Sequence, residues 1–186
     1  MERVDIGVIH GRFQPLHSGH MEYLLAGKER CDFLYIGITN PDPGLTKPVA
    51  VDPARGEALA NPFTYFERMA MVRDALLEAG IPRGEFEVVP FPINYPELIR
   101  YYAPPTARYF ATVYDAWGEH KVEELHRQGF DVEVMWVRTM ADRLTTGKEI
   151  RRRIREGEDW EPFVPAAVTR HLRSIGAQQR LQSLEA

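Results

Sequence analysis

The chain has little cysteine and no long apolar run, and each scarcity excludes a class of protein. Its single cysteine, Cys31, leaves no partner for an internal disulfide, which is typical of a reducing compartment. No apolar run approaches the roughly 20 residues of a membrane span, and the N-terminus lacks the basic and apolar regions of a secretion signal. We therefore expect a cytoplasmic protein that does not bind a membrane, with Cys31 as a small buried apolar residue.

The chain also lacks an excess of positive charge. Its 23 Lys and Arg against 27 Asp and Glu give a net charge of −4, so bulk electrostatics do not favour nucleic acid as a partner. The 186 residues suffice for one compact domain with a real core, and 44% hydrophobic residues are ordinary for a globular protein. No repeat, low-complexity tract or second domain interrupts it, so we expect a single domain over 1–186.

Strand-like and helix-like patterns alternate about five times. The strands are predicted at 4–9, 32–38, 86–91, 111–114 and 132–137. The helices are predicted at 20–30, 64–80, 95–102, 119–128, 148–155 and 165–175. This alternation, with near-continuous apolarity in 32–38, predicts an α/β fold: a Rossmann-like parallel sheet of about five strands with helices on both faces.

Three segments have more specific expectations. Thr64 and Glu67 form the sequence of a capping box at the start of the second helix, where Phe63, Phe66 and Met69 are expected in the core. Segment 39–61 holds several prolines and is too long for an ordinary connection, so we expect a functional loop or a mobile insert. The polar tail 177–186 is expected to fray.

The richest stretch is 7–20, with the sequence GVIHGRFQPLHSGH. A short buried strand is followed by Gly11, which allows a tight turn, and by a helix that begins near His17 and His20. A helix N-terminus carries unpaired N–H groups and partial positive charge, which suit phosphate. Gly19 has no side chain, so a phosphate could approach the backbone there.

A second stretch of this kind is 145–155. Thr146 is a natural N-cap, which leaves free N–H groups for phosphate. On the following helix Arg151 and Arg155 share a face, and Arg152 points elsewhere. These arginines could bind phosphate, or they could form a solvated basic helix paired with neighbouring glutamates, namely Glu149, Glu156 and Glu158.

These motifs resemble those of the HxGH nucleotidyltransferase superfamily, the cytidylyltransferase-like enzymes. The matching segments are GRFQP with HxGH at 11–20, NPFTxxER at 61–68, TGKEIRRR at 146–153 and EGEDW at 156–160. The form of the first motif is most similar to archaeal-type nicotinamide-mononucleotide (NMN) adenylyltransferases. The resemblance implies a Rossmann-like domain that transfers a nucleotidyl group from a nucleoside triphosphate to a phosphate-bearing acceptor and releases pyrophosphate.

The resemblance also implies roles for residues. His17 and His20 contact the triphosphate, with His20 nearest the reacting α-phosphate, and Arg12 clamps phosphate oxygens. Arg151 grips the β- and γ-phosphates, while Arg68 could be a site residue or an ion-pair partner. Mg²⁺ enters bound to the triphosphate, with no protein metal ligands expected. The wider nucleotide-binding set is Gly11, Phe13, Gln14, Gly19, Thr146, Gly147, Lys148 and Arg151.

Histidine suits phosphate binding because its planar ring carries N–H donors and can be cationic near neutral pH. Acceptor phosphates are already anionic nucleophiles, so no strong general base is needed. Charge neutralisation and alignment of the attack are what help the reaction.

The chain departs from the family pattern where the acceptor should bind. There, 93–102 lacks the tryptophan that stacks on nicotinamide in the NMN enzymes. In the phosphate-binding motif, Lys148 replaces the usual Thr or Ser. The candidate acceptor residues are Lys47, Arg55, Asn94, Tyr95 and Trp117. Each could instead have a structural role, either in the core or in a solvated loop.

Three functions follow. The leading one is a nucleotidyltransferase nearest to the NMN adenylyltransferases, which make NAD from ATP and NMN. The second is a CTP-dependent cytidylyltransferase for a small phosphate or phosphonate, because the acceptor region is altered. The third is a nucleotide-binding regulator without turnover. The expected partners are ATP or CTP and a small phosphate-bearing acceptor, and the resemblance suggests a homo-oligomer.

Overall fold

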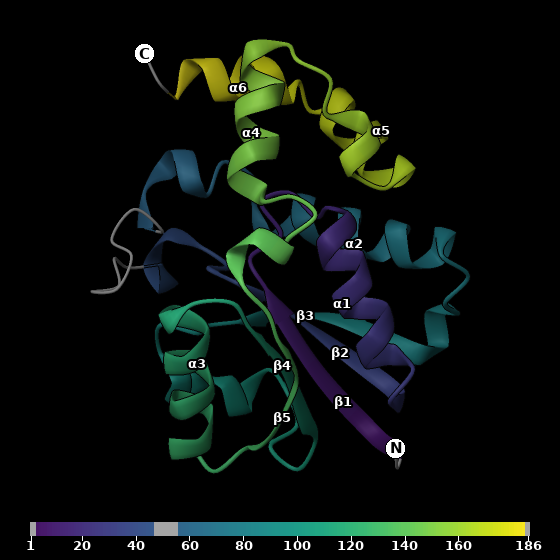
Figure 1. Ribbon diagram of the computed structural model, residues 1–186, viewed down its shortest axis with the longest axis vertical. Helices are drawn as coiled ribbons and strands as arrows, with labels where there is room; N and C mark the ends of the chain where they lie inside the picture. Colours follow the sequence, from purple (N-terminus) through teal and green to yellow (C-terminus); the bar gives the residue numbers. More distant parts are fainter. Residues whose placement is uncertain (1–2, 47–55, 185–186) are drawn as a thin grey trace.

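The computed structural model describes residues 3–46 and 56–184 (Figure 1). Five parallel strands form one sheet in the order β3-β2-β1-β4-β5. The strands are β1 Val4–Gly11, β2 Cys31–Thr39, β3 Phe86–Phe91, β4 Arg108–Val113 and β5 Asp131–Val137. The predicted Rossmann-like parallel sheet is therefore confirmed.

Helices alternate with the strands along the chain, and three more α-helices come after the last strand. They are α1 Ser18–Lys28, α2 Tyr65–Glu78, α3 Ala116–Arg127, α4 Gly147–Glu156, α5 Ala166–Ser174 and α6 Ala177–Ser183. Short 3₁₀ helices lie at Pro43–Leu45, Ala58–Ala60, Arg83–Glu85, Pro96–Tyr101, Met140–Asp142 and Glu161–Phe163. Across 3–46 and 56–184, none of the helices combines the length and apolarity needed to cross a bilayer.

The two faces of the sheet bury different cores. Ile9 of β1 packs in the larger core with side chains of α1, α2, α4, α5 and α6. Its neighbour Val8 points to the opposite face, because successive strand residues alternate, and packs in a smaller core with Leu125 of α3. Helices therefore cover both faces, with α3 on the side away from α1 and α2 (Figure 1).

The strand order places a crossing point at β1. The chain runs from β1 outward to β2 and β3, and then returns to pair β4 with the free side of β1. Connections on either side of β1 therefore leave in opposite directions. In open parallel sheets a binding crevice forms at such a point, beyond the carboxyl ends of the strands. The turn after β1 leads into the HxGH motif, which begins at His17, the N-cap of α1.

The predicted capping box is confirmed, and Arg68 proves to be structural. Thr64 Oγ1 accepts from the Glu67 amide at 3.2 Å, and the Glu67 carboxylate accepts from the Thr64 amide at 2.9 Å. Arg68 is 1% exposed. Its guanidinium donates to the carbonyls of Arg12 at 2.9 Å, Thr39 at 2.7 Å and Asn40 at 2.7 Å. Arg68 thus joins α2 to the segments that follow β1 and β2, through carbonyls rather than a carboxylate.

Two expectations about packing are wrong. Phe66 was expected in the core but is 71% exposed, because it lies on the face of α2 opposite the buried residues Met71 and Ala75. The tail was expected to fray, yet α6 forms there and packs against α4. Ala177 and Leu181 are four residues apart, so they share one helix face, and both are buried.

Candidate active site

A cleft of about 790 Å³ opens at the carboxyl ends of β1 and β4. The N-termini of α1, α3 and α4 converge on it, together with segment 140–146. It brings together all eleven residues that the sequence assigned to catalysis and nucleotide binding: Gly11, Arg12, Phe13, Gln14, His17, Gly19, His20, Thr146, Gly147, Lys148 and Arg151. Two of these, Phe13 and Gln14, have almost fully buried side chains.

The β1–α1 turn is shaped by Phe13 rather than by glycine flexibility at Gly11. Phe13 has φ of 49°, in the left-handed region, whereas Gly11 does not. A side chain at Gly11 would lie 2.7 Å from the Phe13 ring, so glycine is needed there for space. The Phe13 ring itself is fully buried. Phe13 was expected to bind nucleotide, but its side chain belongs to the core.

The Gln14 side chain also has a structural role. It is 2% exposed, and its side-chain amide pairs with the backbone of Phe63. Gln14 Nε2 donates to the Phe63 carbonyl at 2.9 Å, and Gln14 Oε1 accepts from the Phe63 amide at 3.0 Å. This side chain fixes the turn against the start of α2.

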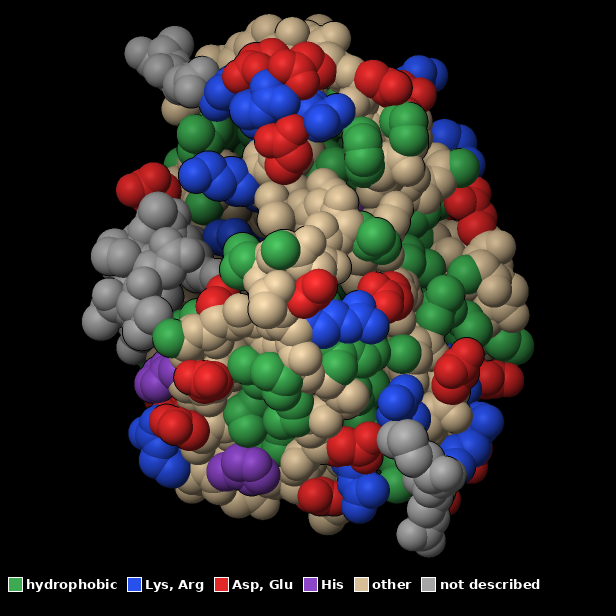
Figure 2. Space-filling model, viewed as in Figure 1, with side chains coloured by type: hydrophobic (Ala, Val, Ile, Leu, Met, Phe, Trp, Pro, Cys, Tyr) green, Lys and Arg blue, Asp and Glu red, His purple; other side chains and the backbone are tan. Residues whose placement is uncertain are grey.

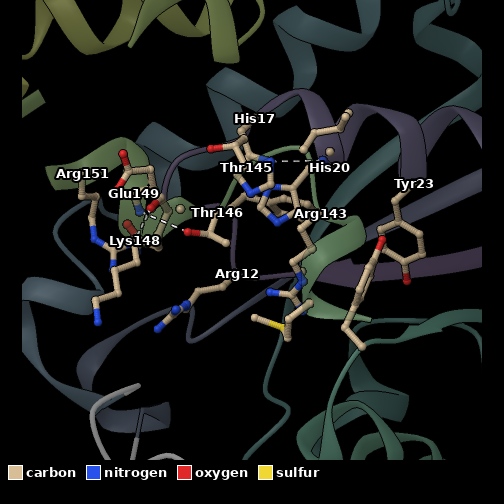
Figure 3. A pocket seen from close by; sticks show the side chains of 18 of the residues that line it. Arg12, His17, His20, Tyr23, Arg143, Thr145, Thr146, Lys148, Glu149 and Arg151 are labelled. Atoms are coloured by element: carbon tan, nitrogen blue, oxygen red, sulfur yellow. Dashed lines mark hydrogen bonds between the residues drawn. The ribbon is translucent and has the colours of Figure 1, made fainter. Parts of the chain in front are cut away.

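His17 and His20 face the cleft as a stacked pair (Figure 3). Their ring centroids are 3.7 Å apart, and His17 is the N-cap of α1. His17 Nδ1 accepts from the His20 amide at 3.3 Å, so the ring proton of neutral His17 is on Nε2. His20 Nδ1 is buried without a hydrogen-bond partner in the described part of the chain.

Burial favours the neutral form of both histidines at pH 7, rather than the cationic form that a histidine can adopt near neutral pH. Burial, and then the charge of Arg143, lowers the pKa of His17 to about 3. Burial also lowers the pKa of His20 well below 6.5, followed by the effects of His17 and Arg143. The pair therefore offers neutral N–H donors, and the arginines carry the positive charge.

The N-terminus of α4 closes against the β1–α1 turn. Thr146 is its N-cap, as predicted, and Thr146 Oγ1 accepts from the Glu149 amide at 3.1 Å. A side chain at Gly147 would lie 2.8 Å from the Gln14 carbonyl oxygen, so glycine permits this close approach. Arg151 Nη1 donates to the same oxygen at 2.6 Å. The motif that contains Gln14 and the motif that contains Arg151, 137 residues further along the chain, are therefore in direct contact.

Arg12 and Arg151 lie close enough to oppose each other's charge. Burial, and then the charge of Arg12, lowers the pKa of Arg151 to about 10. Arg151 has no carboxylate partner among residues 3–46 and 56–184. The side chains of Arg12, Lys148 and Arg151 extend into the same part of the cleft (Figure 3). Two arginines held together in this way favour an anion with several oxygens, such as a triphosphate.

The other arginines of α4 have mainly structural partners. Arg152 bonds to Glu149 at 2.9 Å, to Glu158 at 2.6 Å and to Glu156. Arg153 bonds to Glu149 at 2.8 Å and lies over the Phe163 ring. Acidic and basic side chains gather at this end of the molecule (Figure 2). Of the alternatives for these two residues, the paired helix face is the one that the contacts favour.

The opposite wall contains residues that the sequence did not indicate. The Arg143 guanidinium lies 4.4 Å from the centre of the Tyr114 ring and 3.9 Å from the Asp115 carboxylate. Figure 3 places Arg143 between the two histidines and Tyr23, away from Lys148 and Arg151. Lys121 of α3 lines the same wall. Arg143 belongs to no motif, so only its position three residues before the Thr146 cap could have suggested it.

Only one of the candidate acceptor residues that the structure describes lines the cleft. Trp117, in the first turn of α3, lines the cleft. Asn94 and Tyr95 are not among the lining residues, and Asn94 instead bonds to Asn40 Oδ1 at 3.1 Å. The proposed acceptor role of these two is therefore not supported. Lys47 and Arg55 lie outside the described residues.

Comparison with known proteins decides the family. Residues 8–174 match the family described as cytidylyltransferase-like. The chain belongs to the cytidylyltransferase-like family. It is 51% identical over 177 residues to a phosphonoformate cytidylyltransferase of Streptomyces viridochromogenes, covering 95% of both chains. It is 33% identical over 180 residues to a nicotinamide-nucleotide adenylyltransferase of Thermococcus sibiricus, covering 96% of this chain and 88% of the relative.

Solved structures of this family share the fold. A bifunctional NMN adenylyltransferase/ADP-ribose pyrophosphatase of Francisella tularensis superposes with a TM-score of 0.67 at 16% identity. The match covers 97% of this chain and about half, 51%, of that longer protein. A putative nicotinate-nucleotide adenylyltransferase of Vibrio parahaemolyticus superposes with a TM-score of 0.56 at 14% identity. These structures share the fold of this chain. The family match and the two named relatives show that the chain is a nucleotidyltransferase, as the motifs predicted.

Proposed function

We propose that the protein transfers CMP from CTP to a small phosphonate and releases pyrophosphate. The observation that carries this proposal is the 51% identity to a phosphonoformate cytidylyltransferase over 95% of both chains. The nicotinamide-nucleotide adenylyltransferases are more distant, at 32–33% identity. The second of the three sequence hypotheses therefore replaces the first, and NAD biosynthesis is the less supported role.

The altered acceptor wall agrees with a small acceptor. The segment expected to hold a nicotinamide ring, with Asn94 and Tyr95, does not line the cleft, and of the described acceptor candidates only Trp117 does. Lys121 and Arg143 instead put positive charge on that wall. A compact anion gains more from such charges than a nicotinamide nucleoside does.

The reaction needs alignment more than a base. A phosphonate oxygen attacks the α-phosphorus of CTP, a new P–O bond forms, and the bond to the bridging oxygen breaks. Pyrophosphate leaves with that electron pair. His17 and His20 supply neutral N–H donors to the reacting phosphoryl group, while Arg12 and Arg151 hold the departing pyrophosphate. Such fixed donors stabilise charge as it develops without having to reorganise.

Mg²⁺ is proposed to enter on the CTP phosphates and to neutralise part of their charge. Across the residues that the structure describes, no cluster of three His, Cys, Asp or Glu side chains is arranged to hold an ion. The carboxylates of Asp115 and Asp142 line the cleft and could bond to its water ligands. The phosphate oxygens would be its direct ligands.

The test is a pyrophosphate-release assay in a two-by-two design. Purified protein with Mg²⁺ receives CTP or ATP, each with phosphonoformate or NMN. Release with CTP and phosphonoformate, at least about 100-fold above the other pairs, is the expected result. Release only with the pair ATP and NMN would support an adenylyltransferase instead. Tight CTP binding without release from any pair would support a regulator without turnover.

A further inference from the structure

His10 is a buried polar side chain that the proposed reaction has not used. It lies near the end of β1, one residue before the β1–α1 turn, and lines the cleft. Only 4% of it is exposed. Its strand neighbour in β2 is Gly37. A side chain at Gly37 would overlap the Phe91 ring, so this glycine lets Phe91 of β3 cross and stack on His10.

The stack fixes the imidazole and leaves its edge unsatisfied. The His10 and Phe91 rings are 4.7 Å apart and inclined by only 4°. Neither His10 Nδ1 nor His10 Nε2 has a hydrogen-bond partner in the described chain, although both atoms are buried. Buried polar atoms are almost always paired. Two such atoms on one ring, in the wall of a cleft, indicate that a ligand supplies the partner.

The position of His10 selects which ligand group this is. In-line attack requires the acceptor to lie opposite the departing pyrophosphate, across the α-phosphate. Pyrophosphate would be held by α4, on the side of Lys148 and Arg151 (Figure 3). The backbone of His10 lies beside the Tyr23 hydroxyl. Figure 3 places Tyr23 on the other side of the histidine pair from Lys148 and Arg151. His10 is therefore on the acceptor side.

Charge identifies the chemistry of the group. The pKa of His10 is lowered well below 6.5, first by burial and then by the positive charge of Lys121. The same lysine also lowers the pKa of His20, so Lys121 lies near both the reacting centre and His10. A neutral imidazole N–H next to an ammonium group suits a carboxylate better than it suits a cation or an apolar group.

We infer that His10 determines acceptor specificity by donating a hydrogen bond to a carboxylate that the phosphonate acceptor carries. Lys121 supplies the opposing charge, and Phe91 holds the ring in place. This inference rests on the proposed function, and it adds the group that distinguishes a phosphonocarboxylate from a simple phosphonate. It also explains why a histidine lies where an apolar side chain would continue the small core.

The experiment combines one change in the protein with one in the ligand. The kcat/KM values for phosphonoformate and methylphosphonate, which has a methyl group in place of the carboxylate, are measured with saturating CTP. The parent protein and His10→Phe are compared. Phenylalanine keeps the ring that stacks on Phe91 and removes both nitrogens. His126→Gln, on the exposed last turn of α3, is the matched control.

The expected result is a loss of selectivity rather than of activity. The preference of the parent protein for phosphonoformate should fall at least about 10-fold in His10→Phe, because only the carboxylate loses its donor. The KM for CTP should stay within about 2-fold of the parent. His126→Gln should keep the preference of the parent protein.

Three outcomes would overturn the inference. An equal loss on both acceptors would make His10 a general structural residue, and a raised KM for CTP alone would assign it to the nucleoside. His10→Leu is a second apolar variant, and failure of both variants to fold would show a structural role. A parent protein inactive with every phosphonate would overturn the proposed function first, before any variant is made.

Discussion

The two walls of the cleft are built by different means. On the wall that is proposed to bind the triphosphate, the α4 N-terminus meets the β1–α1 turn at one backbone oxygen: Gly147 closes on the Gln14 carbonyl, and the Arg151 side chain donates to the same oxygen. On the acceptor wall, side chains from separate elements meet, as where Arg143 lies over Tyr114 and beside Asp115. His10 and Phe91 join two strands there by ring stacking.

This difference explains what the two walls can do. Contacts to a backbone oxygen fix a geometry that does not depend on the side chain of Gln14. A wall of side chains can be rebuilt for another acceptor by changing single residues. The family can therefore keep its phosphate chemistry while its acceptors differ, as the names of the two relatives indicate.

The largest expected effect is on the rate, at the point where the two walls meet. His20→Ala removes an N–H donor from the reacting phosphoryl group and should lower kcat by about 10²–10³-fold. The KM for CTP should change much less, because Arg12 and Arg151 still hold the phosphates. Steady-state pyrophosphate release measures both constants. A parental kcat in His20→Ala would remove this histidine from the chemistry.

Stability should depend strongly on the buried guanidinium beneath the cleft. Arg68→Met leaves the carbonyls of Arg12, Thr39 and Asn40 without their donor, and should cost about 3 kcal/mol of unfolding free energy. Urea denaturation measures this cost. Arg83→Met is the control, because Arg83 forms an exposed pair with Glu87 at 2.9 Å and should cost under about 1 kcal/mol. Equal costs would show that Arg68 is not a structural anchor.

Stability should also fall as the pH drops from 7 to 5.5. The folded state holds His10 and His17 neutral, with their pKa values lowered by burial, whereas the unfolded chain binds protons near pH 6.5. Protonation therefore favours the unfolded state, by about 1 kcal/mol for each histidine over this range. Urea midpoints at several pH values measure the slope.

His17→Asn sharpens the pH test. Asparagine can still cap α1 but does not titrate, so the slope should be smaller than in the parent protein. The carboxylates with lowered pKa values, such as Glu149 at about 2, titrate below this range and do not contribute. A slope that His17→Asn leaves unchanged would contradict the neutral assignment.

A smaller effect should separate two adjacent arginines on α4. Arg151→Met should raise the KM for CTP about 10-fold, because it removes a buried charge from the phosphate side. Arg152→Met should leave that KM within about 2-fold, since Arg152 bonds to Glu149, Glu156 and Glu158. Equal effects would mean that α4 acts only through its overall charge.

The features that the sequence predicted correctly are those that a local pattern of residues determines. Alternating apolar runs placed all five strands of the sheet, and the caps at Thr64 and Thr146 follow from side chains three residues from their partners. The HxGH turn was found because its residues are adjacent in the chain. These features are encoded over a few residues, so they can be read without knowing the fold.

Burial and distant contacts could not be read in this way. Phe66 lies on the exposed face of α2 rather than on the face that packs in the core. The charge states of the histidines depend on burial that only the fold creates. Arg143 and His10 belong to no motif. Asn94 and Tyr95 were chosen by their place in the chain, yet the sheet does not bring them to the cleft. The acceptor wall was therefore the part that sequence predicted least well.

The division into two walls is tested most directly by measuring the KM for CTP and the KM for phosphonoformate in the same two variants. We predict that Arg151→Met raises only the KM for CTP and that His10→Phe raises only the KM for phosphonoformate, each about 10-fold. A result in which both variants raise the same KM, or each raises both equally, would contradict the account.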